Sequence, residues 1–354
     1  MSTSGRRLAG VMLLFAAALA VLVLALMGVS ALDPATRPRW VLLVDRSQSM
    51  PRTETDAAAA EMQAALGAAQ VRRIDFAGTP RAAVPDPTQT DIEAALAERG
   101  YAALLANAQG EAPHQQAIVD QLIGRRVDGL ILATARRQDP VLSHCLAAGV
   151  PTVLVNRAED GARAPSVVSD DAGGMRLAVE HLTALGHVRI GHLAGPEDLS
   201  TGMVRRQGFA VAMREAGLAA ASVAVATAFT REAGRAAMAE LLRAAELTAV
   251  VAANDLLALG AYQELAGRGL DCPRDVSIVG HNDMPLVDMV APPLTTVRID
   301  HHTMGQEAAR LVMARIEAEL EQPLVRTTTV RLVVRASTAA PQPSRSVPFA
   351  GERP

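Results

Sequence analysis

Residues 249–298 constrain the fold of this chain more than any other stretch. An apolar strand, Ala249–Ala252, is followed by the polar pair Asn254-Asp255 and by a helix that begins at Leu256. After a turn at Cys272-Pro273 comes a second apolar strand, Val276–Val279, and a second polar cluster, residues 280–283. Buried strands that each end in a short polar cluster are typical of an open parallel sheet, which binds ligands at the carboxyl ends of its strands. The stretch therefore predicts an α/β fold with a small-molecule site.

Motifs of the same kind run from residue 91 to residue 338. They include RRVDGLILA, GVPTVLVNR, SVVSDDAGGMRLAVEHLTALGHVRIGHLAGP, RRQGF, ANDLLALGA, DVSIVGHND, PPLTTVR, MGQEAARLVMARI and VRLVVRAST. In this order and spacing they resemble the LacI/GalR-type regulators, in the periplasmic-binding-protein-like sensor domain of that family. The resemblance implies a two-lobed, type I periplasmic-binding-protein-like fold with parallel sheets.

The resemblance also implies domain boundaries. Lobe one would comprise about 91–169 and 301–322, and lobe two about 170–300 and 323–338. We expect residues 339–354 to form a disordered tail. Lobe one lacks the first strand of the family, and either Trp40–Val44 or Val71–Phe76 could take its place in the sheet.

Five residues match ligand-binding positions of the family, between the two lobes. The resemblance implies that Arg205 clamps a hydroxyl or carboxylate with its forked guanidinium and that Asn254 binds vicinal hydroxyls. It implies lesser roles for three others: Asn156, Asn282 and, as a ring that stacks on a sugar, Phe229.

Structural roles are open alternatives for some of these residues. Asn254 and Asp255 could cap the helix that begins at Leu256, with Asp255 the better candidate. Arg205 could be an ordinary surface ion-pair partner. No nucleophile–base pair, glycine-rich phosphate loop or metalloprotease spacing occurs, so we do not expect an enzyme.

The amino-terminal region predicts membrane attachment. Residues 8–32 carry no charge over a length that can cross a bilayer as a helix. We expect a transmembrane helix or signal anchor there, and hence a protein anchored in the bacterial inner membrane. The side of the membrane on which the sensor lies stays open, because arginines stand on both flanks of the apolar run.

Residues 40–90 resemble the first part of a von Willebrand factor A domain, a partial Rossmann-like segment. The apolar run Trp40–Val44 leads into a D-x-S-x-S loop that offers Asp45, Ser47 and Ser49, and Thr90 could add a further oxygen ligand. Such a loop could hold Mg²⁺, although the sensor requires no cofactor. Alternatively, these residues form only a strand-end turn and a helix cap.

The VxxxAGVSxxTVSR pattern of the family's helix-turn-helix headpiece does not occur, and the net charge of −3 comes with no basic stripe. We therefore expect a non-enzymatic protein that binds a small-molecule effector, of carbohydrate type, without direct DNA binding. A homodimer through the sensor domain is a further expectation. The alternatives are a LacI-family regulator acting without its own headpiece, a membrane-tethered metal-dependent adhesion or assembly module, and a non-functional gene fusion.

Overall fold

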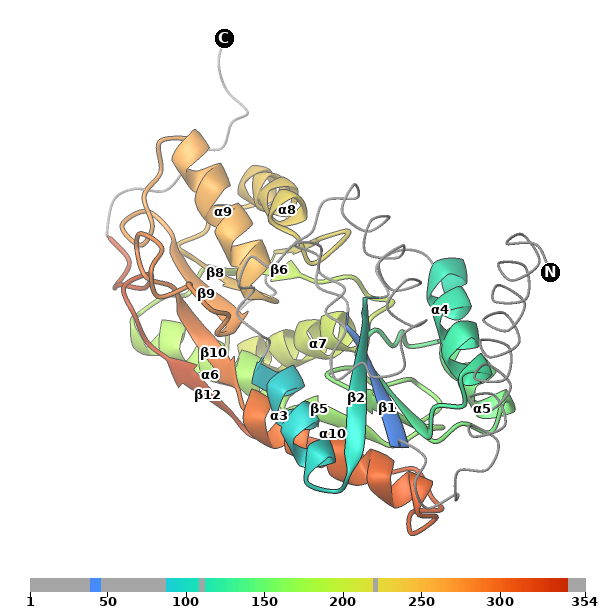
Figure 1. The fold of residues 1–354 in the computed structure, drawn as a ribbon. Helices are drawn as coiled ribbons and strands as arrows, with labels where there is room; N and C mark the ends of the chain where they lie inside the picture. The colour runs from blue at the N-terminus through green and yellow to red at the C-terminus, as the bar shows by residue number, and fades with distance from the viewer. Residues whose placement is uncertain (1–38, 46–86, 108–111, 219–221, 343–354) are drawn as a thin grey trace, which may run out of the picture. The chain divides into compact units, whose positions relative to one another are not determined.

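A computed structural model describes residues 39–45, 87–107, 112–218 and 222–342 (Figure 1). The chain divides into two compact units, residues 1–39 and 40–354, and the fold below is that of the second unit. It contains two six-stranded sheets.

The first sheet has the strand order β11-β5-β4-β3-β1-β2. Its strands are β1 (Arg39–Asp45), β2 (Tyr101–Asn107), β3 (Gly129–Leu132), β4 (Thr152–Val155), β5 (Ser166–Ser169) and β11 (Val325–Thr328). From β1 through β3, β4 and β5 to β11, each strand pairs with the next in parallel. With helices α3 (Pro87–Ala97), α4 (Ala112–Gly124), α5 (Pro140–Ala147) and α10 (His301–Ile316), this sheet forms the first lobe.

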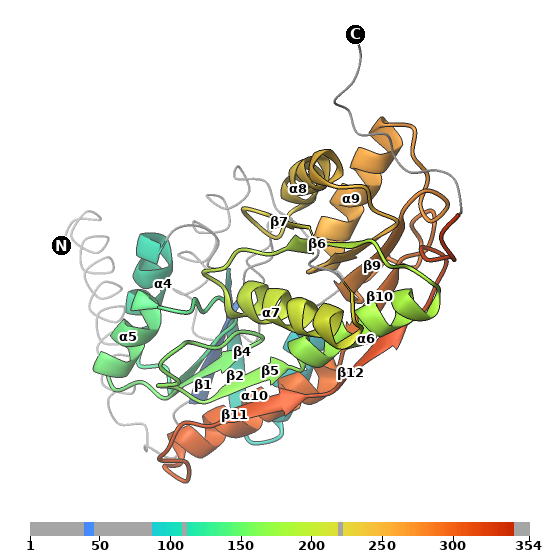
Figure 2. The same ribbon diagram turned by 180° about the vertical axis from the view of Figure 1, so that it is seen from behind.

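The second sheet has the order β12-β10-β9-β8-β6-β7. Its strands are β6 (Ile190–Ala194), β7 (Val223–Val225), β8 (Ala249–Ala252), β9 (Ser277–Asn282), β10 (Thr295–Ile299) and β12 (Val330–Val333). Only β12 pairs antiparallel among the described strands of this sheet. Helices α6 (Asp171–Ala184), α7 (Ser200–Glu215), α8 (Arg231–Ala244) and α9 (Asp255–Gly267) complete the second lobe (Figure 2).

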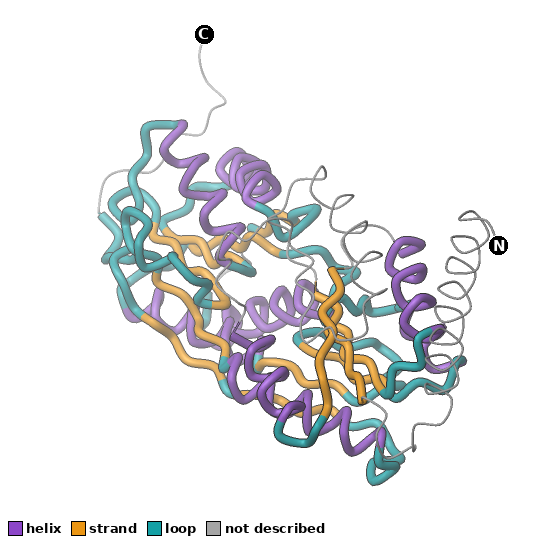
Figure 3. Tube along the Cα trace, in the orientation of Figure 1, coloured by secondary structure: helices purple, strands orange, loops and turns teal. Residues whose placement is uncertain are grey.

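Helices cover both faces of each sheet, as expected for parallel strands that bury all their side chains (Figure 3). In the first lobe, α3 and α10 pack on one face through residues such as Ile92 and Met304, and α4 and α5 pack on the other. In the second lobe, α8 and α9 cover one face, and α6 and α7 cover the other. The apolar runs read from the sequence are therefore the buried strands of two separate cores.

The chain passes between the sheets three times: from β5 to α6, from β10 to α10, and from β11 to β12. The two-lobed α/β architecture predicted from the sequence is confirmed. One boundary needs correction, because Val325–Thr328 pairs with β5 in the first sheet and the crossing falls only after it. Residues 323–338 therefore do not all belong to the second lobe.

The segment Arg39–Asp45 is a strand of the sensor itself. As β1 it lies between β3 and β2, and its residues Val41–Val44 pair in parallel with Gly129–Leu132. It thus takes the vacant place of the first strand in lobe one. The expectation of a separate von Willebrand factor A-like module over residues 40–90 is wrong at this strand, because a strand hydrogen-bonded within the sensor sheet cannot begin another one.

Two terminal expectations fall on residues outside those described. The apolar run 8–32 is one, and most of the expected tail, residues 343–354, is the other. Within the described ranges, no helix is both long enough and apolar enough to cross a bilayer.

Candidate functional site

Polar side chains of the second lobe collect where β8 and β9 end. Asn254 follows β8, Asn282 ends β9, and Arg205 reaches them from α7. Parallel strands present their carboxyl ends at one edge of a sheet, so residues distant in sequence meet there. The predicted site residues of this lobe therefore come from neighbouring elements.

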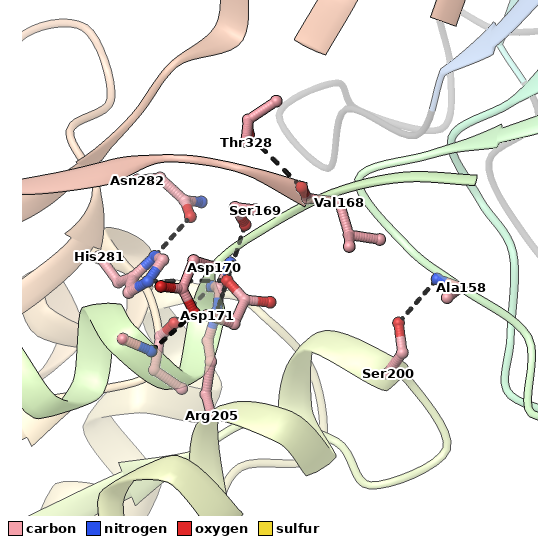
Figure 4. Close-up of polar contacts among 12 residues, drawn as sticks. Ala158, Val168, Ser169, Asp170, Asp171, Ser200, Arg205, His281, Asn282 and Thr328 are labelled. Carbon is pink, nitrogen blue, oxygen red and sulfur yellow. Dashed lines mark hydrogen bonds and ion pairs between the residues drawn. The ribbon is translucent and has the colours of Figure 1, made fainter. Parts of the chain in front are cut away.

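Arg205 is fully buried and held on two sides. Its Nε and Nη2 lie 3.0 and 2.9 Å from Oδ1 of Asp171, and its Nη1 donates to the carbonyl oxygen of Ala253 at 2.6 Å (Figure 4). The side chains of Arg205 and Asp171 are only 3% and 6% exposed. The alternative that Arg205 belongs to a surface ion pair is thus wrong, because both members of its ion pair are buried.

Asp171 is also tied to the point where the chain crosses between lobes. Ser169, the last residue of β5, donates its hydroxyl to Oδ1 of Asp171 at 2.8 Å. The amide of the intervening residue, Asp170, donates to the carbonyl of Thr328 at the crossing from β11 to β12. The acidic partner of Arg205 is therefore fixed to two of the three crossings.

His281 closes this cluster from β9. Its Nε2 lies 3.7 Å from Oδ1 of Asp171, and its Nδ1 lies 3.2 Å from Oδ1 of Asn282. Burial, reinforced by the positive charge of Arg205, lowers the pKa of His281 well below its usual value, so the ring is neutral. The amide oxygen of Asn282 only accepts, so Nδ1 carries the proton and Nε2 has no hydrogen-bond partner among the described residues.

Asn254 is the N-cap of α9. Its Oδ1 accepts from the amide of Leu257 at 2.9 Å. The capping alternative therefore holds for Asn254, whereas Asp255, the better candidate from the sequence, is already the first helical residue. The cap uses only the amide oxygen of Asn254, and its Nδ2 has no hydrogen bond to a described residue.

Asp255 instead holds the loop after β9 through hydrogen bonds to its buried carboxylate. Its carboxylate accepts from the amide of Met284 at 2.8 Å and from the hydroxyl of Thr296 at 2.6 Å. Burial raises the pKa of Asp255 to about 7, against the lowering effect of these two hydrogen bonds. The acid is thus part of the scaffold that holds the Asn282 loop.

The loop that carries Asn282 has an unusual backbone. Asn282 and Asp283 have φ values of +114° and +55°. Asp283 pairs with Arg298 and, at 2.7 Å, with Arg335, which anchors the turn to β10 and to the segment after β12. Such a conformation persists because its surroundings fix it.

Phe229 and Asn156 lie apart from this cluster. The ring of Phe229 packs closely on Gly195, which follows β6. A Cβ added to Gly195 would lie 2.2 Å from Cζ of Phe229. Asn156 follows β4 in the first lobe with a φ of +65°, and its amide donates to the carbonyl of Val167. The structure thus brings Arg205, Asn254 and Asn282 together, leaves Phe229 at a neighbouring strand end, and puts Asn156 in the other lobe. The ligand-binding roles of all five stay predictions.

The metal prediction also stays a prediction. Asp45 ends β1 and Thr90 lies in α3, whereas Ser47 and Ser49 are outside the described residues. No group of three or more His, Cys, Asp or Glu side chains in the described part of the chain could hold a metal ion.

Loops of the two lobes also contact each other, a feature that the sequence analysis did not predict. The amide of Arg137 donates to the carbonyl of Asp198 at 3.0 Å, and Arg136 pairs with the Asp198 carboxylate. Nearby, the hydroxyl of Ser200 accepts from the amide of Ala158 at 3.0 Å (Figure 4). These contacts join the loops after β3 and β4 to the start of α7, the helix that carries Arg205.

Comparisons with known proteins agree with this architecture. The periplasmic binding protein-like domain matches residues 179–338. The HTH-type transcriptional regulator CelR of Thermobifida fusca is 36% identical over 250 residues, which make up 70% of this chain and 73% of that protein.

Solved structures give the same result. A complex of the regulator CelR with cellobiose superimposes with a TM-score of 0.68 at 29% identity, over 87% of this chain and 92% of the other. A LacI family transcriptional regulator from Mycobacterium smegmatis gives 0.66 at 32% identity, over 72% and 95%. A dimeric Lac repressor with a C-terminal deletion gives 0.63 at 27%, over 73% and 95%.

The chain belongs to the LacI/GalR-type family of transcriptional regulators, through its periplasmic-binding-protein-like domain. This finding corrects the expectation of a membrane-anchored protein of the bacterial inner membrane. Its relatives are HTH-type transcriptional regulators. It also corrects the partial von Willebrand factor A assignment, since the alignment with CelR extends over 87% of the chain.

Proposed function

We propose that this protein is a non-enzymatic sensor of a sugar or polyol within a LacI-type regulatory system. The observation that carries the proposal is the pairing of Arg205 with the residue next to Asn254. Nη1 of Arg205 donates to the carbonyl oxygen of Ala253, the residue that precedes Asn254. The guanidinium of Arg205 and the side-chain amide of Asn254 are therefore held at neighbouring positions at the end of β8. Adjacent forked donors of this kind suit the vicinal hydroxyls of a sugar.

The relatives support the ligand class. A regulator named CelR, 29% identical to this chain, has been solved with cellobiose. A small polyol or disaccharide is therefore the ligand to test first. The relatives are transcriptional regulators, a non-enzymatic class, which agrees with the lack of a nucleophile–base motif in the sequence.

Asn254 allows a clean test because its two functions can be separated. Asn254→Ser keeps an oxygen that can cap α9 but removes both Nδ2–H donors. We expect wild type to bind a saccharide from a panel led by cellobiose, and Asn254→Ser to bind it at least about tenfold more weakly, as for one or two lost hydrogen bonds. Isothermal titration calorimetry gives both affinities.

A control is available at the opposite edge of the second sheet. Asp275 accepts from the amide of Asp271 just before β9, so Asp275→Ser shortens a hydrogen-bonded polar side chain at the amino ends of the strands, away from Asn254. This variant should bind like wild type. Binding by Asn254→Ser that equals wild type would remove Asn254 from the site, and no binding of any saccharide at millimolar concentration would favour a non-functional fusion.

A homodimer through the sensor domain is also part of the proposal. A solved relative is described as a dimeric Lac repressor. Light scattering at micromolar concentration should give twice the monomer mass, and a monomer throughout would exclude this assembly. The expected lack of direct DNA binding remains a prediction, since the relatives carry the description HTH-type and residues 1–38 lie outside those described.

A further inference from the structure

The charges around Arg205 balance within the protein before any ligand arrives. Oδ1 of Asp171 lies within 3.0 Å of both Nε and Nη2 of Arg205, and both side chains are buried. The neighbouring His281 ring is neutral, since burial holds its pKa well below the usual value. The positive charge of Arg205 is therefore already neutralised by one buried carboxylate.

The charged side chains that the structure describes beside this pair in the second lobe are acidic or already paired with one another. Asp255, buried on the adjacent strand end, adds negative rather than positive charge whenever it ionises. Asp283 is bound by Arg335 and by Arg298, and the side chain of Arg298 is 41% exposed and hence screened by water. A carboxylate ligand would thus meet an ion pair instead of a free guanidinium.

Arg205 nevertheless keeps donors for a neutral ligand. A guanidinium has five N–H groups, and three of them are directed at Asp171 and Ala253. The two remaining N–H groups can bind hydroxyl oxygens. No described residue donates to Oδ2 of Asp171, so this oxygen can accept from a hydroxyl.

We propose that Asp171 is a specificity-determining residue, which neutralises Arg205 so that the site binds uncharged saccharides and rejects the corresponding sugar acids. This inference rests on the proposed function and adds the charge class of its ligand. An anionic ligand would place a second negative charge against Oδ1 of Asp171 in a water-poor environment, where like charges repel strongly. A hydroxyl ligand meets no such repulsion.

Cellobiose and cellobionate share one glucose ring, but the second unit of cellobionate is an open-chain gluconate that carries a carboxylate. The effect of charge is therefore read from how a variant shifts the preference between these two probes. For wild type we expect calorimetry to show a preference for cellobiose of at least about tenfold. Asp171→Asn removes the charge but keeps nearly the same shape, which leaves Arg205 without a counter-ion. This variant should shift the preference toward cellobionate by at least about tenfold.

Two further variants make the result specific. Glu180→Gln removes a carboxylate of the same helix, from an exposed pair with Arg176, and should leave the preference unchanged. Asp171→Asn combined with Arg205→Gln restores neutrality and should lose the gain for cellobionate. If Asp171→Asn fails to fold, wild type still tests the inference, because equal binding of the two probes by wild type would overturn it.

The outcomes separate this inference from the function on which it rests. If wild type binds cellobiose and cellobionate equally, or if the preference of folded Asp171→Asn equals that of wild type, the charge role of Asp171 is wrong and the saccharide sensor stands. If wild type binds neither probe and no other neutral saccharide, both are overturned. If Glu180→Gln also binds cellobionate more tightly than wild type does, the shift in preference comes from the overall charge of the protein and not from Asp171.

Discussion

The guanidinium of Arg205 and the carboxylate of Asp171 form a buried ion pair that joins α7 to α6, the two helices that cover one face of the second sheet. Its closest N–O distance is 2.9 Å, and Ser169 donates to the same carboxylate oxygen. The pair connects the candidate site to the chain crossing at β5. Its loss therefore affects stability as well as binding.

Arg205→Ala should destabilise the protein strongly. Removal of one partner leaves the other charge buried and unpaired, which costs on the order of 3–5 kcal/mol. Arg205→Met combined with Asp171→Leu removes both charges and should recover most of that loss. Urea denaturation gives the free energies of unfolding, and a cost below about 1 kcal/mol for Arg205→Ala would show that the pair does not hold the fold.

An exposed pair provides the contrast. Arg136 and Asp198 connect the lobes, but their side chains are 34% and 51% exposed. Solvent screening limits such pairs, so Asp198→Asn should change the free energy of unfolding by less than about 1 kcal/mol. The same denaturation experiment tests this, and a loss as large as that of Arg205→Ala would mean that the lobe contact is a major source of stability.

Asp255 should make stability depend on pH in a distinctive direction. Its folded pKa of about 7 lies above its ordinary value of 3.8, so the folded state binds the proton more tightly. The stabilisation from this group is complete below about pH 4 and is lost as the pH rises through 7.

Asp255→Asn imitates the protonated acid, since an amide can accept from the Met284 amide and donate to the Thr296 hydroxyl. Relative to wild type, the variant should therefore gain stability as the pH rises from 4 to 8. Thermal melts across this range check the sign. A difference that stays constant with pH would show that Asp255 titrates normally.

Two helical glycines should respond oppositely to alanine. A Cβ on Gly174 would lie 2.7 Å from Nε2 of His281 and 3.1 Å from Val297, so Gly174→Ala should destabilise by roughly 1–3 kcal/mol. A Cβ on Gly267 meets only the tip of Arg235 at 3.9 Å, and Gly267→Ala should stabilise by up to about 1 kcal/mol. Equal effects on the melting temperature would contradict the close packing of His281 on α6.

Local sequence patterns predicted the elements of the second lobe well. Ala249–Ala252 is β8, and the apolar run Val276–Val279 contains the first half of β9, because short buried strands and polar strand ends are encoded within a few residues. Pairing between distant segments carries no such signal. For this reason the position of Arg39–Asp45 between β3 and β2 stayed one of two alternatives, and Val325–Thr328 was placed in the wrong lobe.

The candidate site likewise contains residues that local motifs identified and one that depends on a contact between distant segments. Motif positions brought forward Arg205 and Asn254, which the structure places near each other. Asp171 was not among the predicted site residues, although it is the counter-ion of an arginine 34 residues later. An aspartate at the start of a helix is common, so nothing in one sequence marks the one that is buried against a guanidinium.

The last crossing between the sheets makes the order of synthesis important for folding. The segment from Val325 to Val333 supplies β11 to one sheet and β12 to the other, and both are edge strands. Until this segment has emerged from the ribosome, the nascent chain exposes the open edges of β5 and β10, which are templates for aggregation. The two lobes are thus completed together by the nine residues from Val325 to Val333, which follow all the other described strands of both sheets.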